Sequence, residues 1–565
     1  MTTQEKLPPN TSKLELPDTV GQNFMKSLEL LGYPDIREGQ VPLMKEIFTG
    51  EDTIGLLPTG GGKTATFVLP GLCRGYRTVV ISPLISLQTD QVSKLHELNV
   101  PAAALNSTNT PKQNSDYLEQ WSRGELQFLY IAPERLATDG SMARILKQSA
   151  EMVVIDEAHC VAEWGDSFRP AYKRIPEFVK ALPGKTQVVA VSATLTLNAE
   201  KSLRRILEFE DTVKRVEVVY NRTNISYKTF LGGDIYDLAK VCMDEPGPTI
   251  VFCSTTVKVD ATARQLASRL GATVLRYHGK LTAAAKRKNQ AAFMSGKNNL
   301  IVATNAFGMG VDKADIRQVV HYDMPGKLEA FAQEAGRGGR DGKACKSILF
   351  YDDDILKLHR SFISSGNPSV NSVRKVWNYL QTSSEKGTKA VSVVPETIAK
   401  QGGVPIYGAD TVMNILVGSK LIVPPDNKGM EIIKLIKMPP KSQVAWYKAY
   451  VKLHEWADEE GHKKSDTLTL PTRQLATMLG FTMVSKMRNV LMFMKERGII
   501  TYTPGTTKYD VNYGKNIDES IDWDLMLDKR EQDFLSLEIM VAFTKTKDML
   551  KADMISNYFS KGTLT

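Results

Sequence analysis

A glycine-rich loop that could hold phosphate groups runs LLPTGGGKT over residues 56–64. Glycines let backbone N–H groups approach phosphate oxygens closely, Lys63 could then reach the β- and γ-phosphates, and Thr64 could ligate Mg²⁺. Thr59, Gly60, Gly61 and Gly62 would form the rest of the cradle. The strict spacing of such loops requires glycine at position 57, where this chain has leucine, so the loop favours a nucleotide site without establishing one alone.

Two adjacent carboxylates follow the apolar run VVI in VVIDEAHC, residues 153–160. A buried parallel strand that ends there places Asp156 and Glu157 at the carboxyl edge of the sheet, where ligands bind in such folds. Asp156 suits Mg²⁺ coordination, and Glu157 suits the positioning or deprotonation of an attacking water. An Asp-Glu pair can equally cap a helix, but together with the glycine loop it predicts a nucleoside triphosphatase.

A third candidate is EAGRGGRDG, residues 334–342. Arg337 and Arg340 lie three residues apart beside glycines that permit close approach, and arginine can stabilise charge on a transferring phosphoryl group. Taken by itself this segment could also be an ordinary basic loop.

Short Val/Ile-rich runs alternate with helical patterns over residues 23–215 and again over 216–360. Examples are TVVISP (78–83), FLYIAP (128–133), MVVID (152–156) and QVVAVSAT (187–194), then TIVFCS (249–254), NLIVAT (299–304) and KSILFY (346–351). Such runs are typical of buried parallel strands, so the pattern predicts two α/β lobes with doubly wound sheets. Residues 1–22 are interpreted as a flexible tail.

The pattern changes after residue 360. Residues 361–440 predict helix, turn, helix and a hairpin in LIVPPDNKGMEIIKLI, while 441–515 repeat that order and end in a hairpin about Pro504-Gly505. Both segments indicate winged-helix-like α+β domains, and 516–565 indicate a helical segment. The chain therefore combines an α/β class with smaller α+β domains.

Composition and charge narrow the class of protein. The 565 residues are 42% apolar and 24% charged, with a net charge of +9 and no apolar run long enough to span a membrane. Residues 356–450 hold 13 Lys/Arg and 5 Asp/Glu, so most of the net charge lies there. This placement favours a polyanion partner, although a solvated basic face is the alternative. Five scattered cysteines without a CxxC pair predict neither disulfides nor a zinc site.

Taken together, the motifs resemble the RecQ family of superfamily-two DNA helicases over residues 23–355. They occur in family order: LGYPDIREGQ (31–40), PTGGGKT (58–64), SPLISLQTDQV (82–92), LNST (105–108), YIAPERL (130–136), DEAHC (156–160), EWGDSFRPAY (163–172), SAT (192–194), ATNAFGMGVDK (303–313) and QEAGRGGRDG (333–342). Two RecA-like lobes and an ATP- and Mg²⁺-dependent 3′→5′ DNA helicase are what this resemblance implies.

The resemblance also implies roles for individual residues. ATP would be bound by Tyr33, Arg37, Gln40, the glycine loop, Gly310 and Asp312. Hydrolysis would use Lys63, Asp156, Glu157, Gln333, Arg337 and Arg340, with Arg340 as the arginine finger. Single-stranded DNA would contact Ser82, Asn106, Arg135, Trp164, Phe168 and Arg169. ATP binding would close the two lobes, and hydrolysis would open them.

The chain departs from the family in several places. No cysteine follows Cys345, so the four-cysteine zinc module of the family is not expected, although residues 529–559 resemble its helical half. Ile36 and Asp166 stand where the family has an aromatic residue and a histidine.

The helix around VSKMRNVLMFMKERG carries Lys486 and Arg488, for which we expect contacts with duplex DNA at a fork. Protein contacts alone are the alternative for these domains. An RNA helicase and a non-catalytic DNA-binding scaffold are the alternatives for the whole chain. Expected partners are single-stranded, forked and duplex DNA, and single-stranded-DNA-binding or recombination proteins. A monomer is favoured, in the cytoplasm at the nucleoid or in the nucleus of a eukaryotic host.

Overall fold

The structure is a computed structural model that describes residues 7–58, 60–106, 108–137, 145, 148–164, 170–193, 195–218, 222–307, 313–383, 390–423, 430–440, 444–462, 466–481, 484–503 and 507–561. The chain divides into two compact units. The first comprises residues 1–356 and 536–565, and the second comprises residues 357–535. Each unit is described separately below.

A seven-stranded parallel sheet forms the first half of the first unit, in the order β3-β4-β2-β5-β6-β1-β7. Its strands are β1 (Thr53–Leu56), β2 (Thr78–Ile81), β3 (Ala102–Leu105), β4 (Phe128–Ile131), β5 (Met152–Asp156), β6 (Gln187–Ser192) and β7 (Lys214–Glu217). Because all strands run in one direction, the loops after β1, β2, β3, β4, β5 and β6 meet at one edge. These are the loops that carry the predicted nucleotide and DNA motifs.

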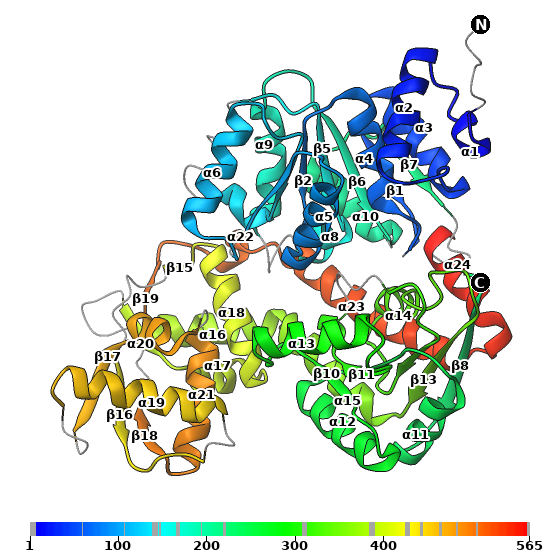
Figure 1. Cartoon of the computed structure of the whole chain (residues 1–565). Helices are drawn as coiled ribbons and strands as arrows, with labels where there is room; N and C mark the ends of the chain where they lie inside the picture. Colours follow the sequence, from blue (N-terminus) through cyan, green and yellow to red (C-terminus); the bar gives the residue numbers. More distant parts are fainter. Residues whose placement is uncertain are drawn as a thin grey trace, which may run out of the picture. The chain divides into compact units, whose positions relative to one another are not determined.

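Helices cover both faces of this sheet (Figure 1). They are α1 (Pro9–Ser12), α2 (Asp18–Leu30), η1 (Glu38–Gln40), α3 (Val41–Thr49), α4 (Lys63–Arg74), α5 (Ile85–Glu97), α6 (Pro111–Ser122), η2 (Pro133–Ala137), α8 (His159–Trp164), η3 (Pro170–Arg174), α9 (Ile175–Ala181) and α10 (Leu197–Leu207). Neighbouring residues of one strand pack on opposite sides: Val80 packs with Phe67 of α4, and Val79 packs with Phe178 of α9. Burial on both faces explains the continuous Val/Ile runs in the sequence.

The beginning of the chain is folded, which corrects the prediction of a flexible tail for the described residues 7–22. Thr11 and Leu14 are buried on the first sheet's helices, and Asp35 accepts hydrogen bonds from the backbone N–H groups of Asn10 (2.8 Å) and Thr11 (2.9 Å). These contacts are long-range in sequence and could not be recognised in the polar segment itself.

A six-stranded parallel sheet forms the second half, in the order β10-β11-β9-β12-β13-β8. Its strands are β8 (Ile225–Leu231), β9 (Thr249–Phe252), β10 (Leu275–Tyr277), β11 (Leu300–Ala303), β12 (Gln318–His321) and β13 (Cys345–Tyr351). The helices are α11 (Ile235–Asp244), α12 (Thr256–Leu270), α13 (Ala283–Met294), η4 (Asn305–Phe307) and α14 (Leu328–Ala335). Helix α15 (Asp354–Gly366) begins in the first unit and belongs to the second unit from residue 357. The prediction of two parallel α/β lobes is therefore confirmed. The first extends to Glu217 because β7 pairs with β1.

The last helices return to the first unit. Only the second half of α23 (Trp523–Lys545), η5 (Asp548–Leu550) and α24 (Lys551–Lys561) belong to it (red in Figure 1). Tyr558 donates a hydrogen bond to Glu329 of α14 (2.8 Å), and Phe543 packs against Phe331 with ring centroids 4.8 Å apart. The predicted segment 516–565 is thus divided between the two units.

The second unit contains two three-stranded sheets whose pairing differs from the predicted hairpins. Its helices are α16 (Val370–Thr382), α17 (Pro395–Gly402), α18 (Ile406–Gly418), α19 (Val444–Glu459), α20 (Thr472–Leu479), α21 (Val484–Glu496) and α22 (Ile517–Ser520). The strands are β14 (Ala390–Val393), β15 (Ile422–Val423), β16 (Met430–Leu435), β17 (Thr467–Pro471), β18 (Ile500–Thr503) and β19 (Thr507–Val511).

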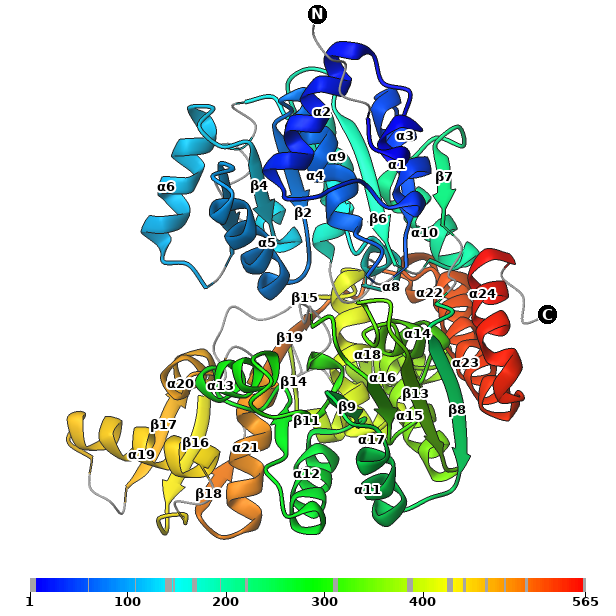
Figure 2. The same ribbon diagram turned by 45° about the vertical axis from the view of Figure 1, so that its right-hand side comes forward.

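Strand β15 pairs with β19, not with β16, and β18 pairs with β16, not with β19. The two expected hairpins are therefore wrong. The first sheet has the order β14-β19-β15 and the second β17-β16-β18, so the segment from β16 to β18 is inserted between β15 and β19 (Figure 2). The cores explain this: Ile422 and Val511 pack in one apolar cluster, while Ile433 and Ile500 pack in the other. Turn residues mark a chain reversal, but the cores choose the partner strand.

Candidate nucleotide and DNA site

The glycine loop connects the carboxyl end of β1 to the N-terminus of α4, which begins at Lys63. Gly60 and Gly62 have φ of 81° and 79°, a conformation that favours glycine. A Cβ on Gly61 would lie 2.8 Å from the Pro58 carbonyl oxygen, so a larger residue would displace the loop. The loop therefore presents backbone N–H groups at a helix N-terminus, which is the arrangement that binds phosphate. Thr59 lies outside the described residues.

Side chains of the segment 33–40 donate hydrogen bonds to the backbone of this loop. The Gln40 side chain donates to the carbonyls of Gly61 (3.2 Å) and Gly62 (3.0 Å), and the Arg37 guanidinium donates to the Gly60 carbonyl. Tyr33 is 46% exposed and can meet a ligand, whereas Ile36 is buried in the core and cannot stack on a base. The structure thus brings two of the three predicted nucleotide residues of this segment onto the loop.

The two carboxylates lie at the end of β5, as predicted, and differ in their surroundings. Burial, together with the charge of Glu157, raises the pKa of Asp156 to about 7, although Lys63 opposes this. Burial also acts on Glu157, but the charges of Lys63, His159, Arg337 and Arg340 hold its pKa below the usual range. A proton shared by the pair therefore resides on Asp156, and Glu157 stays ionised. Mg²⁺ would displace that proton.

Glu157 also has a strained backbone. Its φ is 50°, which is unfavourable for a residue with a Cβ by on the order of 1–3 kcal/mol. Its N–H donates to Asp156 Oδ1 (2.9 Å), and its carboxylate lies 3.4 Å from His159 Nδ1. The same nitrogen is 2.9 Å from the Ser192 hydroxyl at the end of β6, which connects this motif to the SAT segment.

Removal of the buried charge provides a stability test. We expect Asp156→Asn to stabilise the nucleotide-free protein above pH 7, by on the order of 1–3 kcal/mol. In the wild type the folded state binds a proton that the unfolded state releases between pH 3.8 and about 7, so the free energy of unfolding falls as pH rises through that window. Thermal unfolding at pH 5 to 8 measures this, with Asp116→Asn on the exposed face of α6 as the control. A wild-type melting temperature that does not fall across this range would contradict the expectation.

The arginine loop follows α14, which carries the half-buried Gln333. Arg337 is 4% exposed, and burial, followed by the charge of Arg340, lowers its pKa to about 10. Arg340 is less buried, and a Cβ on Gly60 would lie 3.4 Å from its Cγ, so Arg340 lies against the phosphate loop. This placement favours Arg340 over Arg337 as the group that meets the terminal phosphate.

Arg222 was missed in the sequence. Its guanidinium donates to the carbonyls of Gly336 (3.0 Å), Gly338 (2.5 Å) and Gly339 (3.0 Å). Asn224 adds bonds to the carbonyls of Gly339 and Lys343, both 2.8 Å. Arg222 and Asn224 therefore set the backbone of the arginine loop. An isolated Arg-x-Asn preceding a strand carries no signal that would have revealed this.

These residues fit a Mg²⁺–nucleotide. Among the described residues, the buried Arg337 Nε has no hydrogen-bond partner in the protein, which is the state expected of a group that awaits a ligand or water. Lys63 begins the helix, and Thr64 and Asp156 offer a hydroxyl and a carboxylate oxygen for Mg²⁺. The donor set thus matches the phosphates of a nucleoside triphosphate with Mg²⁺, and the helicase family match implies ATP.

Two predicted DNA contacts face inward instead. Ser82 and Asn106 are each 1% exposed. The Ser82 hydroxyl lies 3.4 Å from Asp156 Oδ2, and the Asn106 side chain accepts from the Thr108 N–H (3.0 Å). These side chains are therefore unavailable to DNA here and shape their loops. Arg135 is half-buried and donates to the Asn106 carbonyl (3.2 Å), so it remains a candidate for DNA contact.

Several predicted residues cannot be placed. Phe168, Arg169, Gly310 and Asp312 lie outside the described residues, as do the side chains of Trp164 and Lys486. Their predicted roles remain predictions.

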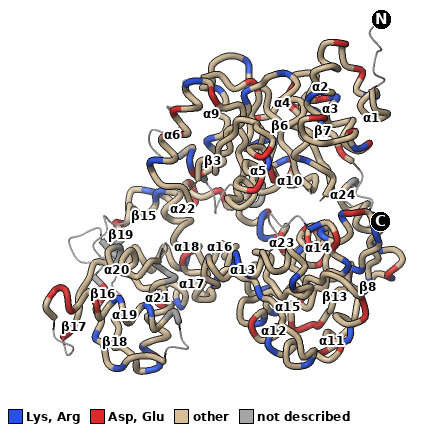
Figure 3. Tube along the Cα trace, viewed as in Figure 1, with Lys and Arg blue, Asp and Glu red and all other residues tan. Residues whose placement is uncertain are grey.

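Arg488 is not a surface residue, which corrects its assignment to DNA. It is 8% exposed and donates through Nε (2.9 Å) and Nη2 (2.7 Å) to Glu431, which has no exposed surface. Tyr502 donates to the other oxygen of Glu431 (2.7 Å). Among the side chains that the structure describes, Lys495 near the end of α21 and Arg497 just beyond it are exposed and basic, and Arg497 also stacks over Trp446. Lys and Arg, blue in Figure 3, occur along helices of both units.

We expect Arg488→Met to destabilise the inserted module by about 3–5 kcal/mol, because Glu431 would remain buried without its cation. The double variant Glu431→Met with Arg488→Met should recover most of this loss. Urea unfolding followed by the fluorescence of Trp446 and Trp456, which pack on the same core, measures the effect. If the single variant kept its stability but lost affinity for duplex DNA, the structural role would be wrong.

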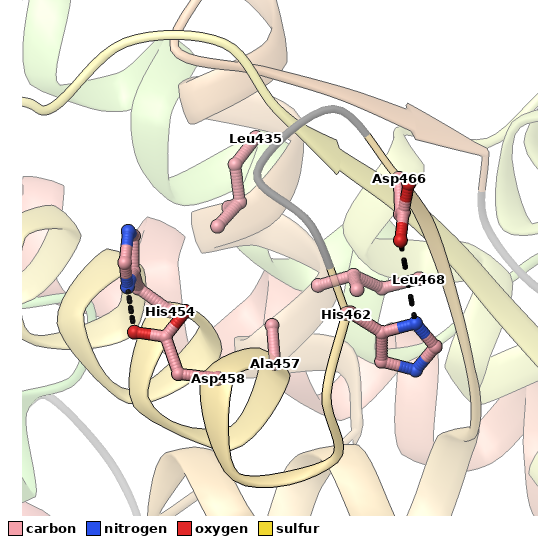
Figure 4. A pocket seen from close by; sticks show the side chains of 7 residues that line it. All are labelled: Leu435, His454, Ala457, Asp458, His462, Asp466 and Leu468. Atoms are coloured by element: carbon pink, nitrogen blue, oxygen red, sulfur yellow. Dashed lines mark ion pairs between the residues drawn. The ribbon is translucent and has the colours of Figure 1, made fainter.

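A small pocket in the second unit lies on the inserted module, lined by Leu435, His454, Ala457, Asp458, His462, Asp466 and Leu468 (Figure 4). It holds two histidine–aspartate pairs, with His454 Nδ1 2.8 Å from Asp458 Oδ2 and His462 Nδ1 3.9 Å from Asp466 Oδ2. Within the described ranges no group of three or more His, Cys, Asp or Glu side chains could hold a metal ion. No helix in the described part of the chain has both the length and the apolar composition needed to span a membrane.

The two parallel sheets, with a glycine-rich loop on the first and an arginine loop on the second, belong to a two-lobed helicase, as the matches to family models show. The family model for the DEAD/DEAH box helicase matches residues 37–202, and that for the helicase conserved C-terminal domain matches residues 234–342. The crystal structure of the DUF1998 helicase MrfA bound to DNA shares the fold, with a TM-score of 0.52 and 17% identity over 61% of this chain and 54% of that one.

Comparison with curated relatives identifies the family within this class of helicases. The chain is 34% identical to the probable ATP-dependent DNA helicase RecS of Bacillus subtilis over 363 residues, which are 63% of this chain and 72% of the relative. It is also 34% identical to the ATP-dependent DNA helicase RecQ of the same organism over 338 residues, which cover 59% and 56% of the two chains. The chain belongs to the RecQ family of superfamily-two DNA helicases.

Proposed function

We propose that this protein is an ATP- and Mg²⁺-dependent 3′→5′ DNA helicase that moves along single-stranded DNA and unwinds duplexes in repair, recombination or replication. The observation that supports it best is a site built from both lobes. Arg340 of the second lobe lies against the phosphate loop of the first lobe, which ends at Lys63. An arginine that reaches the phosphate loop from another lobe makes hydrolysis depend on lobe position.

The chain's residues divide the reaction between them. Lys63 and the loop N–H groups bind the β- and γ-phosphates, and Thr64 and Asp156 would hold Mg²⁺, which would neutralise phosphate charge. Glu157, kept ionised, takes the proton of the attacking water, while Arg340 stabilises charge on the transferring group and Arg337 supports it from a buried position. Hydrolysis removes the γ-phosphate on which both lobes act, which releases the contact between them.

Coupling to DNA is proposed to pass through the segment 163–172, whose Trp164, Phe168 and Arg169 would stack on and pair with a single strand. Arg135 would add a phosphate contact. The second unit would bind the duplex ahead of the motor, with its two modules as winged-helix domains and with Lys486, Lys495 and Arg497 facing phosphates. We further propose that it needs no zinc, acts as a monomer, and works with single-stranded-DNA-binding or recombination proteins in the cytoplasm or, in a eukaryotic host, in the nucleus.

The test is ATP hydrolysis by the wild type and by Trp164→Ala, with and without single-stranded DNA. We expect strong stimulation of the wild type by DNA, at least tenfold, and loss of this stimulation in the variant with basal hydrolysis retained. Partial duplexes with a 3′ or a 5′ overhang then determine polarity.

Each other outcome removes a part of the proposal. Stimulation by RNA and not by DNA would replace it with an RNA helicase. The absence of hydrolysis under every condition would indicate a scaffold that only binds DNA. Unwinding of the 5′-overhang substrate alone would reverse the proposed polarity.

A further inference from the structure

Two buried glutamines of α5 lie directly behind the predicted Mg²⁺ ligands (α5 can be followed in Figure 2). Gln91 is 7% exposed and its Nε2 lies 3.2 Å from the Thr64 hydroxyl. Gln88, one turn earlier, has no exposed surface and donates to the Ser82 carbonyl (2.7 Å). The Ser82 hydroxyl in turn lies 3.4 Å from Asp156 Oδ2. Helix α5 therefore contacts one predicted ligand, Thr64, directly through Gln91, and it holds the backbone of Ser82, whose hydroxyl lies beside the other ligand, Asp156.

The Gln91 amide has an unused atom. Among the described residues, its Oε1 is buried and has no hydrogen-bond partner. Most buried side-chain polar atoms are hydrogen-bonded in folded proteins, so this acceptor beside the predicted Mg²⁺ ligand is available for a bond that forms when the site is filled.

The chemistry of Thr64 shows which bond this is. A hydroxyl that ligates a cation through its oxygen must direct its proton to an acceptor, whereas the present contact points a donor, Nε2, at that oxygen. Rotation of the Gln91 amide by a half-turn exchanges Nε2 and Oε1. The oxygen then accepts the hydroxyl proton, and the lone pairs of Thr64 face the ion.

We propose that Gln91 is the positioning residue of the Mg²⁺ site, with an amide oxygen that accepts the Thr64 hydroxyl proton when the ion binds. The inference rests on the proposed ATP- and Mg²⁺-dependent function and names one further residue of that site. Gln91 does not touch nucleotide or metal itself. It sets the rotamer and the proton of the group that does.

The test compares two substitutions that distinguish the hydrogen-bond donor of the amide from its acceptor. Gln91→Met keeps the length of the side chain and removes donor and acceptor, whereas Gln91→Glu keeps an acceptor and removes the donor. Affinity for fluorescent mant-ADP is measured in EDTA and in a Mg²⁺ titration. We expect Gln91→Met to bind mant-ADP in EDTA as tightly as the wild type does, whereas the increase in affinity on addition of Mg²⁺ should be about tenfold smaller. The affinities of Gln91→Glu should stay within about threefold of those of the wild type.

A second readout separates positioning from general damage. In DNA-stimulated hydrolysis, the Mg²⁺ concentration for half-maximal rate should rise about tenfold in Gln91→Met, while kcat at saturating Mg²⁺ stays within about threefold. Gln187→Met is the matched control, because Gln187 at the start of β6 is also buried with an unpartnered Oε1 but contacts the carbonyls of Ile47 and Glu51. This control should follow the wild type in both assays.

The outcomes distinguish this inference from the proposed function. A wild type that binds no mant-ADP would overturn the nucleotide-dependent function and the Gln91 role together. A wild type with a clear Mg²⁺ effect that Gln91→Met shares would overturn the Gln91 role alone. If Gln91→Glu lost the Mg²⁺ effect as fully as Gln91→Met, the amide would act as a donor and the proposed proton acceptor would be wrong.

Discussion

Glu157→Gln should lower the rate of DNA-stimulated ATP hydrolysis by about 10³-fold and leave ATP binding intact, since general-base catalysis contributes roughly 10²–10⁴-fold. Burial alone would raise the pKa of Glu157, but Lys63, His159, Arg337 and Arg340 act on its carboxylate and hold that pKa below the ordinary value. The glutamine amide has the same shape but cannot accept the water's proton. Single-turnover hydrolysis and mant-ATP binding measure the two effects separately.

The control for this prediction is Glu119→Gln on α6, whose carboxylate pairs with Arg123 on the exposed surface. It should hydrolyse ATP as the wild type does. A Glu157→Gln variant with unchanged kcat would show that another group activates the water. A variant that also failed to bind ATP would show that Glu157 supports the loop structure.

Arg340→Ala should reduce kcat by about 10³-fold or more with less than a tenfold change in ATP affinity, because an arginine finger acts chiefly on charge that develops in the transition state. Arg340 borders Gly60 of the phosphate loop, and its own loop is tied down by Arg222 and Asn224. Arg340→Lys should recover at most about tenfold, because an ammonium lacks the planar fork of donors. Steady-state kinetics together with nucleotide binding provide the measurement.

Substitution of Arg337 should have a different effect from substitution of Arg340. It is 4% exposed and beside Glu157 and Glu334, so Arg337→Ala should lower thermal stability as well as kcat. Arg264→Ala on the exposed side of α12 is the control and should change neither. If Arg337→Ala lost hydrolysis without destabilisation while Arg340→Ala remained active, the roles of the two arginines would be exchanged.

Much of the motor could be predicted from the sequence, since its signals are local. The runs that became β2, β4, β5 and β6 are Val- and Ile-rich because both faces of those strands are buried, and the motifs follow the strands directly. Parallel strands bring such loops to one edge, so the prediction that Lys63 and Asp156 share a site needed no knowledge of packing.

Other assignments failed because an isolated residue type does not reveal its partner. Arg488 on a basic helix has the sequence signal of a phosphate contact, yet Glu431, 57 residues earlier, takes it into the core. Ser82 and Asn106 occur in family motifs, but their side chains turn inward. Likewise two turn segments predicted two hairpins, but β15 pairs with β19 across the inserted module and β16 pairs with β18 within it.

The sequence alone therefore determined the parallel lobes, the nucleotide loop, the carboxylate pair and the family, because strand burial and loop chemistry are encoded within a few neighbouring residues. Only the tertiary structure decided that residues 7–22 are folded and that β16 to β18 form an insertion. It also placed Arg222 on the backbone of the arginine loop and Gln91 beside Thr64. Each of these features depends on contacts between segments that are far apart in the chain. The energies of burial and of strand pairing depend on which segments meet, and no local sequence pattern specifies the partner.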